Sequence, residues 1–146
     1  MSNFDVPATY APPASADLWN PHVRPVIRPR CLSGMHGDID VPHPYLAEPL
    51  AAVPAGDVRV FIFGDTQGAV RGRPLGGGTP LGAFAFAEPA VLRVGDPVRV
   101  DGSLVGHLCG FAGPFVVIKS GHSFCGGELE AGPDTLLEIG GESAVA

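Results

Sequence analysis

The chain has few basic residues and few cysteines, and each shortage excludes a class of protein. Its 146 residues include 9 Lys and Arg against 15 Asp and Glu, for a formal net charge of -6, and the basic residues do not gather with aromatic ones. A phosphate-binding surface needs concentrated positive charge, so we expect no nucleic-acid partner. The cysteines are an odd number in different settings, which favours a reduced compartment or a metal role over a disulfide framework.

Long apolar runs are also absent. No stretch approaches the roughly 18 apolar residues that a membrane-spanning helix requires. The N-terminus has no basic segment followed by an apolar one, which is the pattern of a signal peptide. We therefore expect neither insertion in a membrane nor export by a signal peptide.

Glycine and proline are abundant, and they favour a fold without helices. The 21 Gly and 16 Pro penalise helix interiors, while a hydrophobic content of 45% argues against disorder throughout the chain. A chain of this length can form one domain with one modest core. The composition therefore predicts a single all-β domain with short strands and many turns.

An internal repeat leads to the same fold class. The pattern Ala-Gly, seven residues, Gly begins at Ala55, Ala112 and Ala131, and the intervening residues read DVRVFIF, PFVVIKS and PDTLLEI. Runs rich in Val, Ile, Leu and Phe between glycines are typical of short β-strands joined by tight turns. We expect three equivalent strand units. Elsewhere, residues 70–81 have the composition of a loop, and residues 90–104 alternate as in a hairpin around Gly95-Asp96.

The first thirty residues form a separate segment. They contain prolines at positions 7, 12, 13, 21, 25 and 29, which exclude a helix and favour extended geometry at the preceding residues. Their many apolar side chains indicate a strap that packs on another surface, with a free tail as the alternative. We therefore divide the chain into an extended Pro-rich arm, residues 1–30, and a β-domain, residues 31–146.

Histidine and cysteine occur in turns close to the repeats. His36 lies in SGMHGD, His107 in GHLCGFAG, and His122 and Cys125 in GHSFCGG. Because His122 and Cys125 are three residues apart, one tight turn could present an imidazole and a thiolate to the same tetrahedral cation. If the three units surround one axis, their turns converge. We therefore predict a metal site made of His36, His107, His122 and Cys125.

The end of the chain resembles a known family. SFCGGELEAGPDTLLEIGG, residues 123–141, resembles the closing repeat of PAAR-repeat proteins, which reads Cys-Gly-Gly, a short strand, Gly-Ser, and an apolar strand ending in Ile-Gly-Gly. LRVGDP, residues 92–97, is similar to the family's recurring Ala-Arg-Val-Gly-Asp segment. The resemblance covers residues 90–141 well and residues 31–141 loosely. The long insertion VPHPYLAEPLAAVP, the missing Asn-Gly-Lys-Pro turn and the N-terminal arm depart from the family, and they suit a divergent tip from a phage or an extracellular particle.

The resemblance implies a fold and a metal. PAAR-repeat proteins are small β-cones of three hairpin repeats about a pseudo-threefold axis, in which three His and one Cys near the vertex hold a structural zinc ion. Cys125 matches the family's Cys-Gly-Gly cysteine, His36 resembles its His-Gly turn with His43 as a rival, and His107 and His122 fall in the remaining turns. We expect zinc, with iron as the second choice. A site closed by four protein ligands has no position for a reactive water, so it is structural and not catalytic.

The resemblance also implies a function. We expect a non-enzymatic spike tip that caps the homotrimeric β-helical spike of a contractile injection machine, one chain on three spike subunits, with transient contact with the target membrane. It would be made in the bacterial cytoplasm, assembled into a phage tail, tail-like particle or type VI secretion apparatus, and be extracellular or injected on firing, with or without an effector as cargo. The alternatives are a small metallohydrolase that uses the same His/Cys cluster, and a metal-free β-solenoid surface module.

Overall fold

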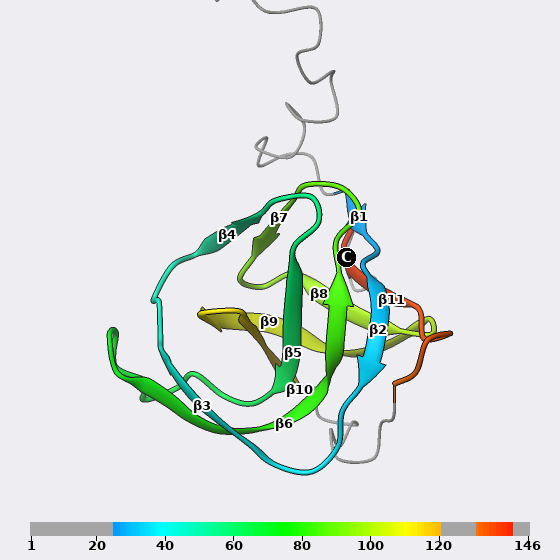
Figure 1. Ribbon diagram of the computed structural model, residues 1–146. Helices are drawn as coiled ribbons and strands as arrows, with labels where there is room; N and C mark the ends of the chain where they lie inside the picture. Colours follow the sequence, from blue (N-terminus) through cyan, green and yellow to red (C-terminus); the bar gives the residue numbers. More distant parts are fainter. Residues whose placement is uncertain (1–24, 121–130, 142–146) are drawn as a thin grey trace, which may run out of the picture.

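The computed structural model describes residues 25–120 and 131–141 of the chain (Figure 1). This part of the chain contains eleven strands and no helix, which confirms the all-β prediction. Among the described residues, accordingly, no helix is long and apolar enough to cross a membrane.

In chain order the strands are β1 (Val26–Ile27), β2 (Arg30–Gly34), β3 (Ile39–Pro44), β4 (Leu50–Val53), β5 (Val58–Phe63), β6 (Pro74–Ala85), β7 (Ala90–Arg93), β8 (Pro97–Val100), β9 (Ser103–Ala112), β10 (Phe115–Ser120) and β11 (Leu137–Gly140). The main sheet has the order β1-β11-β8-β9-β10-β5-β6-β2, and β3 pairs with the first half of β6. β4 and β7 form a separate two-stranded sheet. β5 and β10 run parallel, with Val60 opposite Phe115, whereas the other strand pairs of the described residues are antiparallel.

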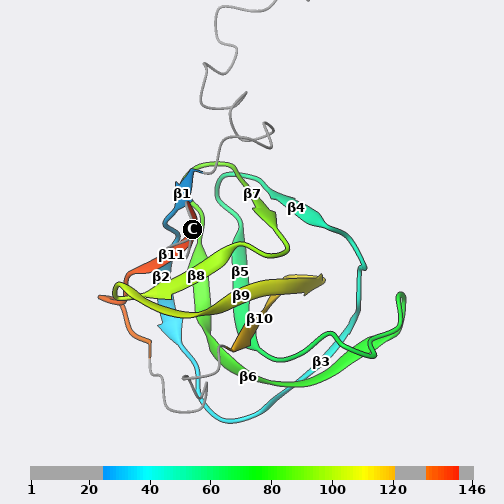
Figure 2. The ribbon, with the colours of Figure 1, turned by 180° about the vertical axis from the view of Figure 1, so that it is seen from behind.

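The main sheet closes on itself where the start of the described chain meets its end. β1 pairs with β11 through Val26 opposite Gly140, and Arg30 of β2 continues the same antiparallel register opposite Leu136. On its other side Arg30 pairs with Ala85 of β6. β1 and β2 therefore join the two ends of the strand order, and the sheet forms a barrel (Figures 1 and 2).

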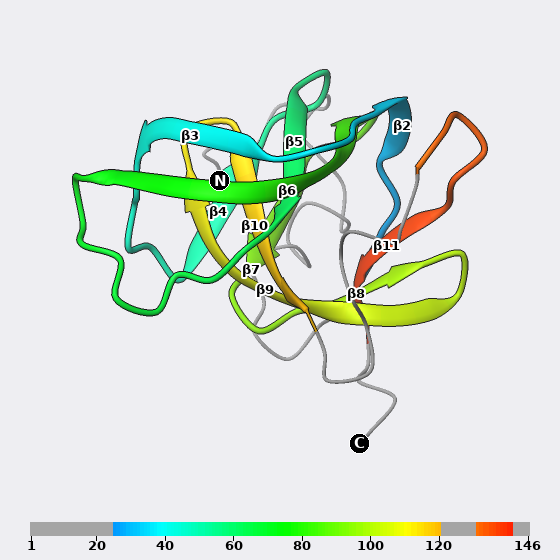
Figure 3. The ribbon, with the colours of Figure 1, turned by 90° about the horizontal axis from the view of Figure 1, so that it is seen from below.

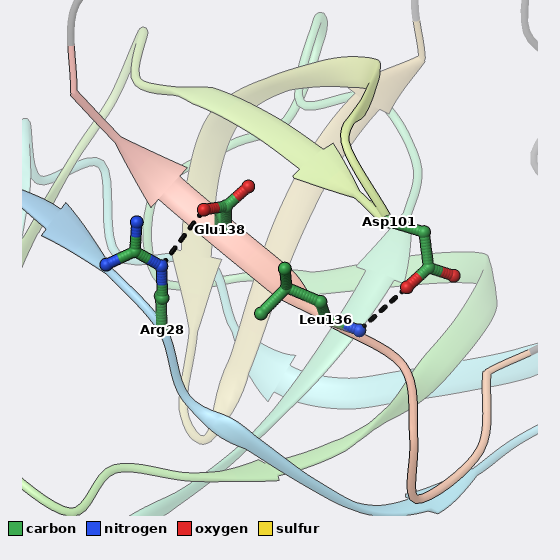
Figure 4. A network of polar contacts seen from close by, with 4 residues as sticks. All are labelled: Arg28, Asp101, Leu136 and Glu138. Atoms are coloured by element: carbon green, nitrogen blue, oxygen red, sulfur yellow. Dashed lines mark hydrogen bonds and ion pairs between the residues drawn. The ribbon is translucent and has the colours of Figure 1, made fainter.

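Two polar contacts lie beside the strand pairing that closes the barrel (Figure 4). The Nε of Arg28 donates to Oε2 of Glu138 at 3.0 Å, and the backbone N–H of Leu136 donates to Oδ1 of Asp101 at 2.9 Å. The Arg28 side chain is exposed, and an exposed ion pair contributes less than about 1 kcal/mol. The backbone ladder between β1, β2 and β11 therefore contributes more to the closure than the ion pair does.

Two hydrophobic clusters lie on opposite faces of β5 and β10. Phe61 and Val116 belong to the larger cluster, inside the barrel. Ile62 and Val117, their neighbours in sequence, belong to a smaller cluster that also includes Val41 of β3. Strands buried on both faces have continuous apolar runs, which is why DVRVFIF and PFVVIKS show little polar alternation.

The three repeat copies form strands as predicted, but their arrangement differs from the prediction. The copies correspond to β5, β10 and β11. β5 and β10 are neighbours, whereas β11 is separated from β10 by β8 and β9 and from β5 by β6 and β2. The first two copies associate because both are buried on two faces, and the third pairs at the closure instead. Among the strands of residues 25–120 and 131–141, the order therefore shows neither three equivalent hairpins about a threefold axis nor the stacked rungs of a β-solenoid.

The loop predicted at residues 70–81 is wrong for most of its length, because β6 begins at Pro74. The glycines at 76–78 pair with β3 (Figure 3). A Cβ added at Gly78 would lie 3.0 Å from the carbonyl oxygen of Phe63. Glycine serves there for the close approach of two strands rather than for a turn.

The hairpin predicted around Gly95-Asp96 is also wrong. β7, which precedes this turn, pairs with β4, while β8, which follows it, pairs with β9 and β11. The hairpin forms one turn later, at Asp101-Gly102, where both residues have positive φ.

The end of the predicted arm is part of the barrel. Residues 25–30 contain β1 and the first residue of β2, so the sheet begins before the boundary predicted between residues 30 and 31. The rest of the arm, residues 1–24, lies outside the described residues.

The barrel closure predicts the effect of a methyl group at Gly140. This residue has a φ of 87°, and an added Cβ would lie 2.8 Å from the carbonyl oxygen of Pro25, next to β1. We expect Gly140→Ala to lower the free energy of unfolding in urea by about 1–3 kcal/mol because the backbone is strained and β1 is displaced.

Gly132→Ala is the matched control. Gly132 has no positive φ and no atom within 4 Å of an added Cβ. It should keep the wild-type urea midpoint or exceed it slightly, because alanine restricts the unfolded chain. Equal urea midpoints for Gly140→Ala and Gly132→Ala would contradict the closure of the barrel by β1.

Candidate functional site

His107 lies beside one end of the undescribed segment 121–130. Its side chain is exposed on β9, and its backbone is opposite Lys119 of β10. The next residue of β10, Ser120, is opposite Gly106 and is the last residue described before the segment. The predicted ligands His122 and Cys125 lie outside the described residues. The register therefore places His107 next to the point where the segment that carries them begins.

The other end of this segment lies beside the strand that leads to His36. A Cβ added at Gly34, the last residue of β2, would overlap the carbonyl oxygen of Ala131, so the two backbones are in direct contact. Ala131 is the first residue described after the segment, and it also packs against the larger hydrophobic cluster. His36 follows Gly34 by two residues, and its side chain is exposed. The segment therefore ends close to the connection that carries His36.

These two contacts involve the described residues that flank the segment with His122 and Cys125. The segment with His122 and Cys125 starts beside the strand of His107 and returns beside the strand that precedes His36. Within residues 25–120 and 131–141 alone, no three His, Cys, Asp or Glu side chains gather in a group that could hold a metal ion.

His43, the rival of His36, lies at the opposite end of β10. Its ring packs against Phe115, with 5.5 Å between the ring centroids, and its Nδ1 would lie 2.6 Å from a Cβ added at Gly113. Gly113 and Phe115 are at the start of β10, whereas His107 is beside its end. At roughly 3.3 Å per residue this strand separates the two positions by more than about 13 Å. His43 and His107 therefore lie at opposite ends of β10.

Cys109 stands near His107 in the sequence but has the surroundings of a core residue. It is half-buried and packs against the smaller hydrophobic cluster. Its Sγ donates to the carbonyl oxygen of Gly64 at 3.9 Å, and Oγ1 of Thr66 donates to the Cys109 carbonyl at 3.1 Å. Burial raises the pKa of the Cys109 thiol, and the hydrogen bonds with Thr66 oppose this only in part. The neutral thiol is favoured, so Cys109 does not resemble a thiolate ligand.

Cys31 is a core residue too. It lies on β2 with 2% of its surface exposed, and it belongs to the larger cluster inside the barrel. Burial raises the pKa of its thiol, while a hydrogen bond with the backbone of Ser33 lowers it. Of the three cysteines, Cys125 is thus the one whose surroundings the structure does not describe.

Comparison with protein-family models, with curated proteins and with solved structures finds no match to this chain. The resemblance to PAAR-repeat proteins therefore stays a prediction from the sequence.

The raised pKa of Cys109 predicts slow alkylation. Because burial disfavours the thiolate, the folded state loses stability relative to the unfolded state as the pH rises from the pKa of the unfolded thiol through the raised folded-state pKa. We expect iodoacetamide at about pH 8 to leave Cys109 and Cys31 unmodified in the native protein and to modify both in urea. Peptide mass mapping distinguishes the cysteines. Native labelling of Cys109 as fast as in urea would show that its thiol is not protected.

Proposed function

We propose that this chain is a structural, non-enzymatic spike tip that caps the trimeric central spike of a contractile injection machine. A structural zinc ion held by His36, His107, His122 and Cys125 would fix its piercing end. The observation that supports the metal site most directly is the position of residues 120 and 131, which lie against the strands near His107 and His36. The spike itself is inferred from the resemblance of residues 90–141 to PAAR-repeat proteins.

The four ligands come from three separate parts of the chain. His36 lies in the connection between β2 and β3, His107 lies on β9, and the other two lie in the segment between β10 and β11. A tetrahedral zinc ion would supply a cross-link among these parts and no reactive position, since all four ligands are protein side chains. The chain holds such an ion with three neutral imidazoles and one thiolate, so binding should weaken as the pH falls.

The barrel has the features of a body that must resist deformation. A closed sheet has no free edges, and two of its strands, β5 and β10, are buried on both faces. β3, which lies off the closed path, carries Pro42 and Pro44, and prolines lack the N–H that a further strand would need. These features favour a rigid structural part whose sheet neither opens nor pairs with strands of other proteins.

The proposed partner is a homotrimeric β-helical spike. Because the strand order is not threefold, one chain would bind the trimer in any of three equivalent orientations. The tip would be made in the bacterial cytoplasm, assembled into the particle, and carried outward or into the target when the machine fires, meeting the target membrane only transiently. Either a phage-type particle or a secretion apparatus suits this role, with or without an effector attached.

The metal site is tested by two histidine substitutions. Wild-type protein purified without an affinity tag should contain about one equivalent of zinc by elemental analysis. His36→Ala should lose the metal and melt at a lower temperature, because a ligand is removed. The matched control His43→Ala removes an exposed histidine at the other end of β10 and should retain the metal. Less than about half an equivalent in the wild type, or equal loss in both variants, would contradict the site.

X-ray absorption spectroscopy of the same sample separates the structural role from the metallohydrolase alternative. Three nitrogen ligands and one sulfur ligand, all from the protein, are expected for a structural site. A first shell of three protein ligands and one water oxygen would instead support a hydrolytic enzyme.

The capping role is tested by stoichiometry. Mixed with the purified spike trimer of its machine, the chain should form a complex of one tip and three spike subunits, measured by light scattering after gel filtration. The control is the same trimer without its terminal β-helix, which should not bind. Failure to form the complex, or equal binding to the shortened trimer, would overturn the capping role even if the metal site is correct.

A further inference from the structure

A groove of about 410 Å³ lies where β1 meets the connection between β6 and β7. Residues 25–29 form one wall and residues 86–90 form the other. Both segments lie at the same end of the barrel in two opposite views (Figures 1 and 2). Phe86, a buried core residue, contributes to its lining, and Val26 leaves 41% of its surface exposed there. The groove therefore offers a surface that is partly apolar and partly polar, close to the seam where the barrel closes.

The groove contains one charged group without a partner among the described residues. Glu88 is exposed on the wall formed by residues 86–90, and no hydrogen bond or ion pair joins it to this part of the chain. The other charged residue, Arg28, donates to Glu138 on β11 (Figure 4). A suitable occupant therefore has a large apolar side chain, a hydrogen-bond donor and a positive charge.

The described chain begins at this groove. Pro25, the first described residue, belongs to one wall, and 24 residues precede it. The nearest of them, residues 18–24, read LWNPHVR and contain Trp19 and Arg24. Trp19 is six positions before Pro25, so at roughly 3.3 Å per residue the chain between them can span up to about 20 Å. That length is enough to turn back and place Trp19 in the groove.

We propose that residues 18–24 fold back into this groove, with the Trp19 ring against the exposed side chain of Val26 and its indole N–H near the Glu88 carboxylate. An indole combines a broad apolar face with one N–H donor, which matches a partly apolar groove that carries a single carboxylate. Arg24 adds a charge opposite to that of Glu88. Docked in this way, residues 18–24 form a strap over β1, a role that is independent of the metal site.

The single tryptophan of the chain makes this docking measurable. In the full-length protein, Trp19 should emit at shorter wavelength than free tryptophan amide and should be quenched less by acrylamide, because its ring is buried. Ala87→Arg places a long charged side chain on an exposed position in the groove. This variant should shift the emission to longer wavelength and raise the quenching constant to that of the protein in urea.

Ala47→Arg is the matched control, since Ala47 is an exposed alanine in the connection between β3 and β4, outside the groove. It should leave both the emission and the quenching unchanged, and circular dichroism should show both variants folded. Wild-type Trp19 that is as accessible as free tryptophan amide, or quenching that is the same in Ala87→Arg and the wild type, would overturn the proposal. Protection that disappears on dilution, together with dimers on gel filtration, would also overturn it, because the groove would then hold the arm of a second copy.

Discussion

The parallel pairing of β5 with β10 is the constraint on which the rest of the barrel depends. Both strands are apolar on both faces, so each needs other residues to cover it above and below. Their buried backbone N–H and C=O groups also need a paired strand on each side. Two parallel strands cannot be joined by a tight turn, and the chain must travel a long way from the end of one to the start of the other. In this protein that path contains β6, β7, β8 and β9, and three of these strands complete the barrel wall.

The same pair determines where the candidate ligands lie. β10 separates two histidines, because His43 packs at its start and His107 lies beside its end. The segment 121–130 leaves from that end and returns at Ala131, against Gly34. A metal site there would connect parts of the barrel that are distant in sequence, whereas the proposed strap of residues 18–24 would act at the seam formed by β1 and β11. Both proposals therefore concern segments outside the strands, namely the connection between β10 and β11 and the residues that precede β1.

The strands themselves could be predicted because their signals are local. Apolar runs between glycines marked β5, β10 and β11 correctly, since neighbouring residues decide whether a segment can be extended and buried. Strand partners could not be predicted in the same way. Gly95 and Gly102 both follow short β-like runs and both adopt positive φ, yet only the second turn joins paired strands, because β7 is already paired with β4. The glycines at 76–78 were misread for a related reason, since their role comes from β3 and from the Phe63 backbone, which lie far away in sequence.

The amino-acid sequence by itself determined the all-β class and the positions of the repeated strands, and it named the His and Cys residues that are candidate metal ligands. Only the tertiary structure decided that two repeat copies are parallel neighbours, that residues 25–30 close the barrel, and that His43 and His107 lie at opposite ends of β10. The physical reason is the range of the interactions. Backbone propensity and apolar patterning act between near neighbours, whereas strand pairing depends on which edges remain free after the whole core has formed.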